Sequence, residues 1–143
     1  MIPREKPLIL VIDDSLICLE LVSDALEDAG FAVETSAKPL GSSKLIVDLR
    51  PDVVVIDIGM PALDGATLVQ IIQRNHIHNC PVLLHTDRAR AELTATIRAS
   101  GADGGAIKSP DSAELIEVIQ SVLSRWRRAS DDSPGASGRW RRS

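Results

Sequence analysis

The sequence predicts an α/β protein in which a five-stranded parallel sheet and five helices form one domain. Short apolar runs alternate with longer segments whose apolar residues recur at helical spacing. The connections between these segments are short, which is typical of a parallel sheet with helices on both faces and right-handed crossovers. The 143 residues are 44% apolar and 25% charged, as expected for one globular domain with an aliphatic core.

The first third of the chain predicts two strands and two helices. The run PLILVIDD at 7–14 is apolar almost throughout, as expected for a strand that is buried on both faces. Ser15 can cap the helix that follows, and Gly30 can end it. The segment FAVET at 31–35 alternates apolar and polar residues, which predicts a more exposed edge strand. A second helix is expected over 39–50.

The middle of the chain repeats the same alternation. The apolar strand VVVID at 53–57 is followed by a loop and by a helix expected over 66–75. The next pair consists of the buried strand PVLLHT at 81–86 and a helix at 90–100. The short segment GGAIK at 104–108 then completes the set of strands.

The last helix begins after Pro110 and is marked by a wide apolar stripe. Its apolar positions are Leu115, Val118, Ile119, Val122 and Trp126. We expect the folded domain to span residues 1–128 and to be followed by a disordered basic tail at 129–143, which is polar and contains Gly, Ser and Pro. The breadth of the stripe also predicts a partner or homodimer face near this helix.

Charge and cysteine usage narrow the class of protein. The net charge of −4 combines a body of −8 with a terminal segment, residues 125–143, of +4. An acidic body disfavours nucleic-acid binding, except weakly through the tail. Cys18 and Cys80 lack the spacing of a disulfide framework or a zinc site. With no apolar run approaching the ~20 residues of a membrane span, we expect a cytoplasmic protein without a membrane segment.

Chemically active residues end four of the five predicted strands. They are Asp13 and Asp14, then Asp57, Thr86 and Lys108. Parallel α/β sheets bind ligands beyond the carboxyl ends of their strands, so these residues should share one crevice. Three carboxylates there require a compensating cation, and Mg²⁺ accepts one or two carboxylates together with waters and phosphate oxygens. Together with a lysine and a hydroxyl, this set predicts phosphoryl chemistry.

Over roughly residues 7–125, the chain resembles the receiver domains of bacterial two-component response regulators, and within that family the stand-alone, chemotaxis-regulator type. The matching motifs are VIDDS, VVVIDIGMPALDG with its D-x-x-M-P-x-x-D-G spacing, PVLLHT, and the lysine of AIKSP. The resemblance implies a flavodoxin-like fold with strand order 2-1-3-4-5. It also implies a phosphorylation-switched signalling module, not an enzyme acting on other substrates.

The resemblance assigns roles to the residues that match these motifs. It implies that Asp57 accepts a phosphoryl group from a phosphohistidine. Asp13 and Asp14 would serve the Mg²⁺ site together with Asp57 and the backbone carbonyl of Gly59. Because Gly59 and Arg88 flank the expected path of the attacking water, the lifetime of the acyl phosphate should be atypical, in a direction that the residues do not give.

The fifth strand departs from the family pattern. Thr86 would bond a phosphoryl oxygen and Lys108 would counter its charge, but the switch aromatic expected three residues before the lysine is replaced by Gly105. The usual relay from threonine to aromatic ring therefore cannot operate. Ser109 also separates Lys108 from Pro110, and a cis bond before a non-proline residue costs about 2.5–4 kcal/mol, so we expect a trans bond there.

Other polar residues have simpler interpretations. Asp64 is more typical of a turn than of a metal ligand. His76 and His78 are expected to be solvated side chains at a helix end. His85 precedes Thr86 and should point to the opposite face of its strand, away from a phosphoryl group.

Two enzyme or cofactor classes remain as alternatives. A Mg²⁺-dependent phosphohydrolase with an aspartyl nucleophile would need a D-x-D motif and a cap insertion, whereas Asp13 and Asp14 are adjacent and no insertion is present. A flavodoxin-type flavin binder would need a glycine-rich or hydroxyl-rich first loop to hold phosphate, whereas the first loop of this chain is anionic. The expected partners are a sensor histidine kinase or histidine phosphotransfer protein and a downstream protein target.

Overall fold

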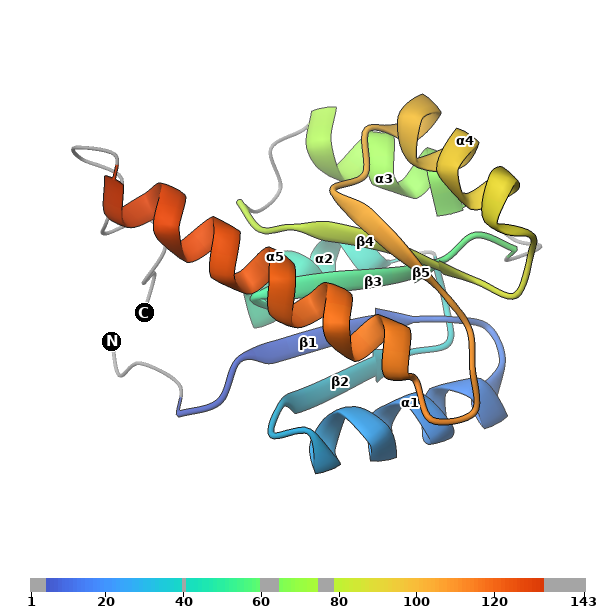
Figure 1. Ribbon diagram of the computed structural model, residues 1–143, viewed down its shortest axis with the longest axis horizontal. Coiled ribbons are helices and arrows are strands. Elements are labelled where there is room, and N and C mark those ends of the chain that lie inside the picture. Colours follow the sequence, from blue (N-terminus) through green and yellow to red (C-terminus); the bar gives the residue numbers. More distant parts are fainter. Residues whose placement is uncertain (1–4, 40, 60–64, 75–78, 133–143) are drawn as a thin grey trace.

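Five parallel strands form one sheet in the order β2-β1-β3-β4-β5 in the computed structural model of the protein (Figure 1). The structure describes residues 5–39, 41–59, 65–74 and 79–132. The order confirms the flavodoxin-like arrangement expected for the family. The strands are β1 (Leu8–Ile12), β2 (Ala32–Ser36), β3 (Val53–Asp57), β4 (Val82–Thr86) and β5 (Gly104–Ile107).

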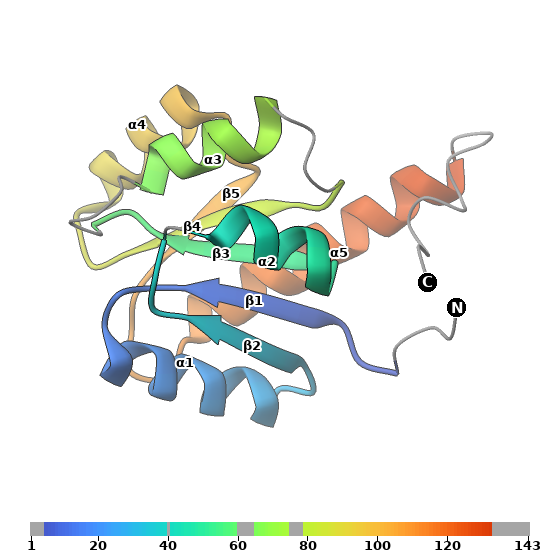
Figure 2. The ribbon, with the colours of Figure 1, turned by 180° about the vertical axis from the view of Figure 1, so that it is seen from behind.

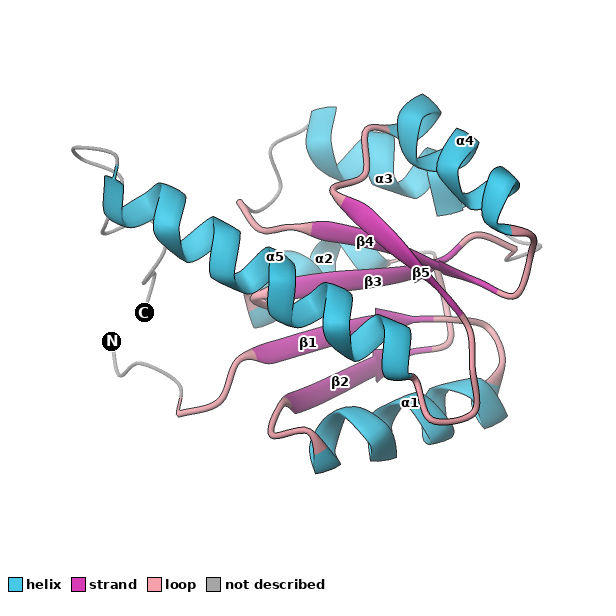
Figure 3. Ribbon diagram, in the orientation of Figure 1, coloured by secondary structure: helices cyan, strands magenta, loops and turns pink. Residues whose placement is uncertain are grey.

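Helices cover both faces of this sheet (Figure 3). The opposite views show helices in front of the sheet and behind it (Figure 1 and Figure 2), and the residues of the two cores assign each helix to a face. On the first face are α1 (Leu16–Asp28) and α5 (Ala113–Asp132). On the second are α2 (Ser42–Leu49), α3 (Gly65–Arg74) and α4 (Arg90–Ser100).

Two aliphatic cores result because successive strand residues point to opposite faces. In β1, Ile9 and Val11 pack with α1 and α5, whereas Leu10 and Ile12 pack with the helices of the other face. The central strands β1, β3 and β4 are buried throughout, and β2, at the edge, is exposed or half-buried. The apolar runs of the sequence therefore mark the strands that have neighbours on both sides.

Local signals set several of the helix ends. The Ser15 hydroxyl accepts a hydrogen bond from the Cys18 N–H at 3.2 Å and caps α1, as expected. The helix expected over 39–50 is shorter in the structure. It begins at Ser42 because Gly41, at φ 90°, adopts a left-handed conformation, and it ends at Leu49 because Arg50, at φ 51°, does the same.

The last helix is longer than expected. Helix α5 continues to Asp132, so residues 129–132, which we assigned to the tail, belong to the helix. Residues 133–143 lie outside the described residues. Within the described ranges, no helix has the length and apolar character needed to cross a membrane.

Candidate functional site

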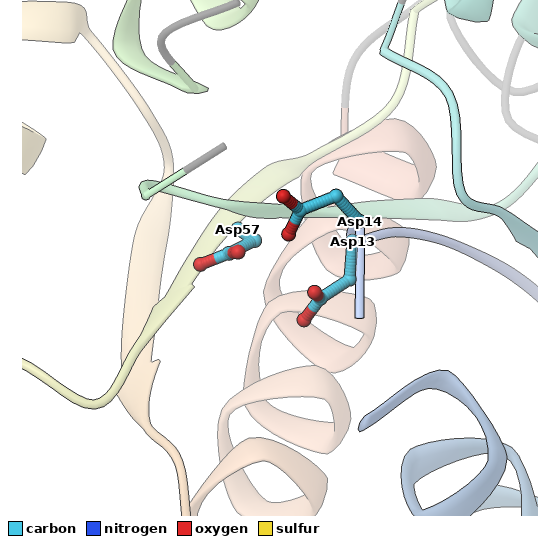
Figure 4. A group of neighbouring side chains, drawn as sticks. All are labelled: Asp13, Asp14 and Asp57. Carbon is cyan, nitrogen blue, oxygen red and sulfur yellow. The ribbon is translucent and has the colours of Figure 1, made fainter. Parts of the chain in front are cut away.

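Three aspartates meet at the carboxyl edge of the sheet. Asp13 and Asp14 follow β1, and Asp57 ends β3, the neighbouring strand. One carboxylate oxygen from each lies within 4.8 Å of the others, and Figure 4 shows the three groups turned toward a common space. Asp13 and Asp57 are buried and Asp14 is exposed. The structure therefore brings together the three carboxylates expected at a Mg²⁺ site.

Backbone N–H groups orient the two buried carboxylates. The Ser15 N–H donates to Asp13 Oδ1 at 2.9 Å, and the Gly59 N–H donates to Asp57 Oδ1 at 3.2 Å. Each carboxylate also keeps a second oxygen for other partners. A cation that prefers hard oxygen ligands fits this donor set, since the oxygens converge and two of the groups are held in place.

Lys108, which follows the edge strand β5, pairs with both of these carboxylates. Its Nζ lies 2.9 Å from Asp13 Oδ2 and 3.5 Å from Asp57 Oδ1. The Lys108 N–H donates to the Thr86 carbonyl at 2.6 Å, which fixes the start of this side chain against β4. One lysine is thus shared by two buried carboxylates, and the cluster of three keeps a net negative charge.

Burial and hydrogen bonding shift the pKa values of this group in different directions. Burial alone would raise the pKa of Asp13, but hydrogen bonds from the Cys18 thiol, the Ser15 N–H and Lys108 together lower it. Burial raises the pKa of Asp57, and the Gly59 N–H and Lys108 offset this only in part. For Lys108, burial acts against the charged form, yet the hydrogen bond to Asp13 and the charge of Asp57 raise its pKa.

Thr86 and the peptide bond after Lys108 also bear on the site. Thr86 is buried at the end of β4, where its Oγ1 accepts a hydrogen bond from the Arg88 N–H at 3.0 Å. In the sheet register, Asp57 pairs with His85, so Thr86 lies one residue further along the neighbouring strand. The bond between Lys108 and Ser109 is trans, as expected, since the described residues contain no cis peptide bond.

The position of the missing switch aromatic is filled by neighbouring atoms. A Cβ added to Gly105 would lie 2.8 Å from Leu93 Cδ1, 2.9 Å from the Leu84 carbonyl oxygen and 3.1 Å from Ile97 Cδ1. Leu93 and Ile97 belong to α4. Helix α4 therefore packs directly on the backbone of β5, and no side chain fits between them.

His85 is buried at the end of β4, directly before Thr86. It is 2% exposed, and among the described residues neither ring nitrogen has a hydrogen-bond partner. Burial and the charge of Lys108 lower its pKa to about 4. The buried ring is therefore neutral near pH 7. Asp64, His76 and His78, which we interpreted as a turn residue and two solvated side chains, lie outside the described residues.

An ion pair that sequence reasoning missed links two helices beside the site. Arg90, at the start of α4, donates two hydrogen bonds to the Glu114 carboxylate in the first turn of α5, at 2.6 and 2.7 Å. The two residues are 24 positions apart, so local spacing gives no sign of the pair. It joins the segment after β4 to the segment after β5.

The chain matches one known protein family over most of its length. Residues 9–120 match the family model of the response regulator receiver domain. The chain is 32% identical over 120 residues to the DNA-binding dual master transcriptional regulator RpaA of Synechocystis sp., covering 83% of this chain and 50% of that protein. It is 30% identical over 120 residues to the transcriptional regulatory protein PrrA of Mycobacterium tuberculosis, covering 84% and 51%. The chain thus spans about half the length of the curated relatives it matches.

Solved structures resemble the chain over most of its length. The chemotaxis response regulator CheY4 of Vibrio cholerae superimposes with a TM-score of 0.73 at 29% identity, over 82% of this chain and 98% of that one. The Francisella response regulator 1452 receiver domain gives a TM-score of 0.73 at 28% identity, over 85% and 99%.

Proposed function

Because the chain belongs to the response regulator receiver domain family, we propose that Asp57 is its phosphoacceptor and that phosphorylation there changes which partner it binds. The observation that carries the proposal is the placement of Asp57. This carboxylate ends a fully buried strand, lies beside two further carboxylates and is within 3.5 Å of a lysine. Such a group is oriented, partly desolvated and next to compensating charge, as a carboxylate nucleophile requires.

The ligands proposed for a bound Mg²⁺ are Asp13, Asp14, Asp57 and the backbone carbonyl of Gly59. The three convergent carboxylates support this set because hard oxygen donors suit that ion. When bound, Mg²⁺ would neutralise charge on the phosphoryl oxygens. The Gly59 carbonyl is included on the strength of the family resemblance.

Phosphoryl transfer then needs little more than positioning. An Asp57 oxygen forms a bond to phosphorus as the P–N bond to the donor histidine breaks, and the leaving imidazole nitrogen keeps that electron pair and takes up a proton. Lys108 would balance charge on the phosphoryl oxygens, and Thr86 would donate its hydroxyl to one of them. The chain acts on its own aspartate, and later hydrolysis of the acyl phosphate returns it to the starting state.

The expected partners follow from this chemistry. The phosphodonor would be a sensor histidine kinase or a histidine phosphotransfer protein, and the phosphorylated chain would bind a downstream protein target in the cytoplasm. We assign this role to the folded domain, which was expected over residues 1–128 and whose last helix extends to Asp132. Homodimerisation near α5 and weak nucleic-acid binding through the basic tail remain secondary predictions.

Intact-mass spectrometry after treatment with acetyl phosphate and Mg²⁺ tests the proposal. The parent chain should gain the mass of one phosphoryl group, and Asp57→Asn should gain none because the amide is not a competent nucleophile. Asp28→Asn, at an exposed position near the end of α1, is a matched control that should be labelled like the parent. Stoichiometric labelling of Asp57→Asn, or no labelling of the folded parent, would contradict the assignment.

A further inference from the structure

The geometry points to Arg88 as a second cation for the phosphoryl group on Asp57, acting through the space that Gly59 leaves without a side chain. This inference rests on the function proposed above and adds a phosphoryl-binding residue to the same site. It gives Arg88 a role that the motifs do not assign, since these place only Lys108 and Thr86 against the phosphoryl group.

The first observation is the position of the guanidinium group. Arg88 Nη2 lies 3.8 Å from the point that a Cβ on Gly59 would occupy, and Asp57 Oδ1 lies 4.0 Å from the same point. The guanidinium and the nucleophilic carboxylate therefore border one small volume. Gly59 leaves this volume open because it has no side chain.

The second observation is how Arg88 is held. Its N–H donates to Thr86 Oγ1 at 3.0 Å, and Thr86 is buried, so the start of the arginine side chain is fixed against the end of β4. The outer part of the side chain is half exposed and pairs with Glu92 at 3.9 Å, a long contact that is open to solvent. Such a surface pair contributes little, so the guanidinium can turn to a stronger anion at low cost.

The third observation is the charge left uncompensated at the site. Lys108 already lies 2.9 Å from Asp13 and 3.5 Å from Asp57. A phosphoryl group on Asp57 brings further negative charge and acceptor oxygens to carboxylates that already share this lysine. A guanidinium suits this position because its planar set of donors can bind two phosphoryl oxygens at once.

The consequence is a phosphorylated state stabilised by two cations on different strand ends. Lys108 follows β5 and Arg88 follows β4. The Arg88 contact forms only when the phosphoryl group is present, because the residue pairs with Glu92 in the unphosphorylated chain. Arg88 should therefore affect binding of a phosphoryl group without affecting binding of Mg²⁺ alone.

Beryllium fluoride, which occupies the position of a phosphoryl group on a carboxylate, separates these two effects. With saturating Mg²⁺, calorimetry should show that Arg88→Ala binds beryllium fluoride about three- to tenfold more weakly than the parent, as expected for one partly exposed charge-assisted contact. Arg88→Lys should lie between the two. Arg98→Ala, which removes an exposed arginine near the end of α4, should match the parent.

Two further measurements exclude a merely structural effect. The affinity for Mg²⁺ alone should be the same in Arg88→Ala as in the parent. In a Gly59→Leu background, where a side chain fills the shared volume, Arg88→Ala should have no additional effect on beryllium fluoride binding.

The outcomes distinguish this inference from the proposed function. If the parent binds beryllium fluoride with Mg²⁺ and Arg88→Ala binds it equally well, the role of Arg88 is wrong and the phosphoacceptor role of Asp57 stands. If Arg88→Ala weakens Mg²⁺ binding to the same degree, its effect is structural and the inference is likewise wrong. If the parent binds no beryllium fluoride, the proposed function fails and the inference fails with it.

Discussion

Aspartates at the amino ends of the strands and aspartates at the carboxyl ends have different hydrogen-bond partners. At the amino ends, Asp52 accepts a hydrogen bond from the Leu8 N–H at 2.7 Å and Asp103 accepts one from the Val82 N–H at 2.8 Å. These carboxylates satisfy backbone donors of the first residues of β1 and β4. At the carboxyl ends, Asp13 and Asp57 share one lysine. The same residue type therefore completes the sheet at one edge and forms the candidate site at the other.

His85 predicts a specific acid sensitivity. Its pKa is lowered to about 4 in the folded chain from an ordinary value of 6.5, because burial and Lys108 disfavour the charged ring. The unfolded chain therefore binds more protons between these pH values, and the free energy of unfolding should fall as the pH drops from 6.5 toward 4. By the usual conversion, the loss amounts to about 3 kcal/mol at most.

Urea unfolding of the parent and of His85→Leu across this pH range measures the effect. The parent should lose more stability than His85→Leu, since carboxylate titration is common to both and the histidine contribution is not. Equal slopes for the two proteins would show that His85 is already protonated in the fold or that the ring reaches water.

At this scale, the sequence predicted the residues that end strands. An apolar run that stops at a carboxylate is visible without a structure, and the rule for parallel sheets brings Asp13, Asp14 and Asp57 to one edge. Arg88 was expected beside the site, but the direction of its side chain and the pairing of Glu114 with Arg90 could not be predicted in this way. Both depend on where a flexible side chain extends in three dimensions, and the space beside Gly59 exists only once the loop and the strand ends are placed.

At the scale of elements, α4 and β5 share a contact without an intervening side chain. Gly105 leaves only backbone at this point of the strand, and Leu93 and Ile97 of α4 fill the place where a switch aromatic would lie. The ion pair between Arg90 and Glu114 then joins the first turn of α4 to that of α5. Because β5 has no aromatic ring at this position, a shift of Thr86 would have to be transmitted by α4, which packs directly on the backbone of β5.

A side chain at residue 105 should destabilise the fold. A Cβ there would lie 2.9 Å from the Leu84 carbonyl oxygen, which belongs to a central strand and cannot easily move. Gly105→Ala should therefore cost about 1–3 kcal/mol in the free energy of unfolding, the usual cost of overpacking a core.

Gly104→Ala is the matched control for this prediction. Its Cβ would lie 3.3 Å from Leu83 Cδ2 and 3.6 Å from Val118 Cγ1, so only small side-chain adjustments are needed. Denaturant unfolding should place it within about 1 kcal/mol of the parent, because the loss of glycine freedom in the unfolded chain offsets the tighter contact. A similar loss in the free energy of unfolding for both variants would mean that β5 tolerates no added side chain at either position, whether or not that position contacts α4.

Helix ends were less predictable than helix existence. The periodic apolar residues indicated all five helices, but α2 begins and ends where Gly41 and Arg50 adopt left-handed conformations. Apolar spacing does not report such dihedral angles. The extension of α5 through residues 129–132 was missed because polar residues there looked like the start of a tail, although a helix can continue beyond the part that packs on the sheet.

At the scale of the whole molecule, the site and the fold are linked by the order of the strands. β1 and β3 are adjacent at the centre of the sheet, so Asp13 and Asp14 meet Asp57 there, and β4 and β5 bring Thr86 and Lys108 from the side. The two buried cores hold these strand ends in register. A ligand that binds the three carboxylates should therefore stabilise the entire domain against unfolding.

Thermal unfolding with and without Mg²⁺ tests this link. At a Mg²⁺ concentration ten times the dissociation constant, the folded chain should gain about 1.4 kcal/mol, visible as a higher Tm. Asp14→Asn should gain less, because it removes an exposed carboxylate of the cluster. Asp24→Asn, an exposed residue of α1, should respond like the parent. A gain that persists fully in Asp14→Asn would place the ion elsewhere.

The lysine shared by Asp13 and Asp57 gives the domain an internal substitute for its proposed metal ion. Because Lys108 Nζ already lies 2.9 Å from one carboxylate and 3.5 Å from the other, the strands that carry them do not depend on an external ion to stay together. In a medium depleted of magnesium by a chelator, the protein should stay folded and yet fail to take up a phosphoryl group. Loss of the ion would then silence the signal reversibly, without exposing the protein to degradation.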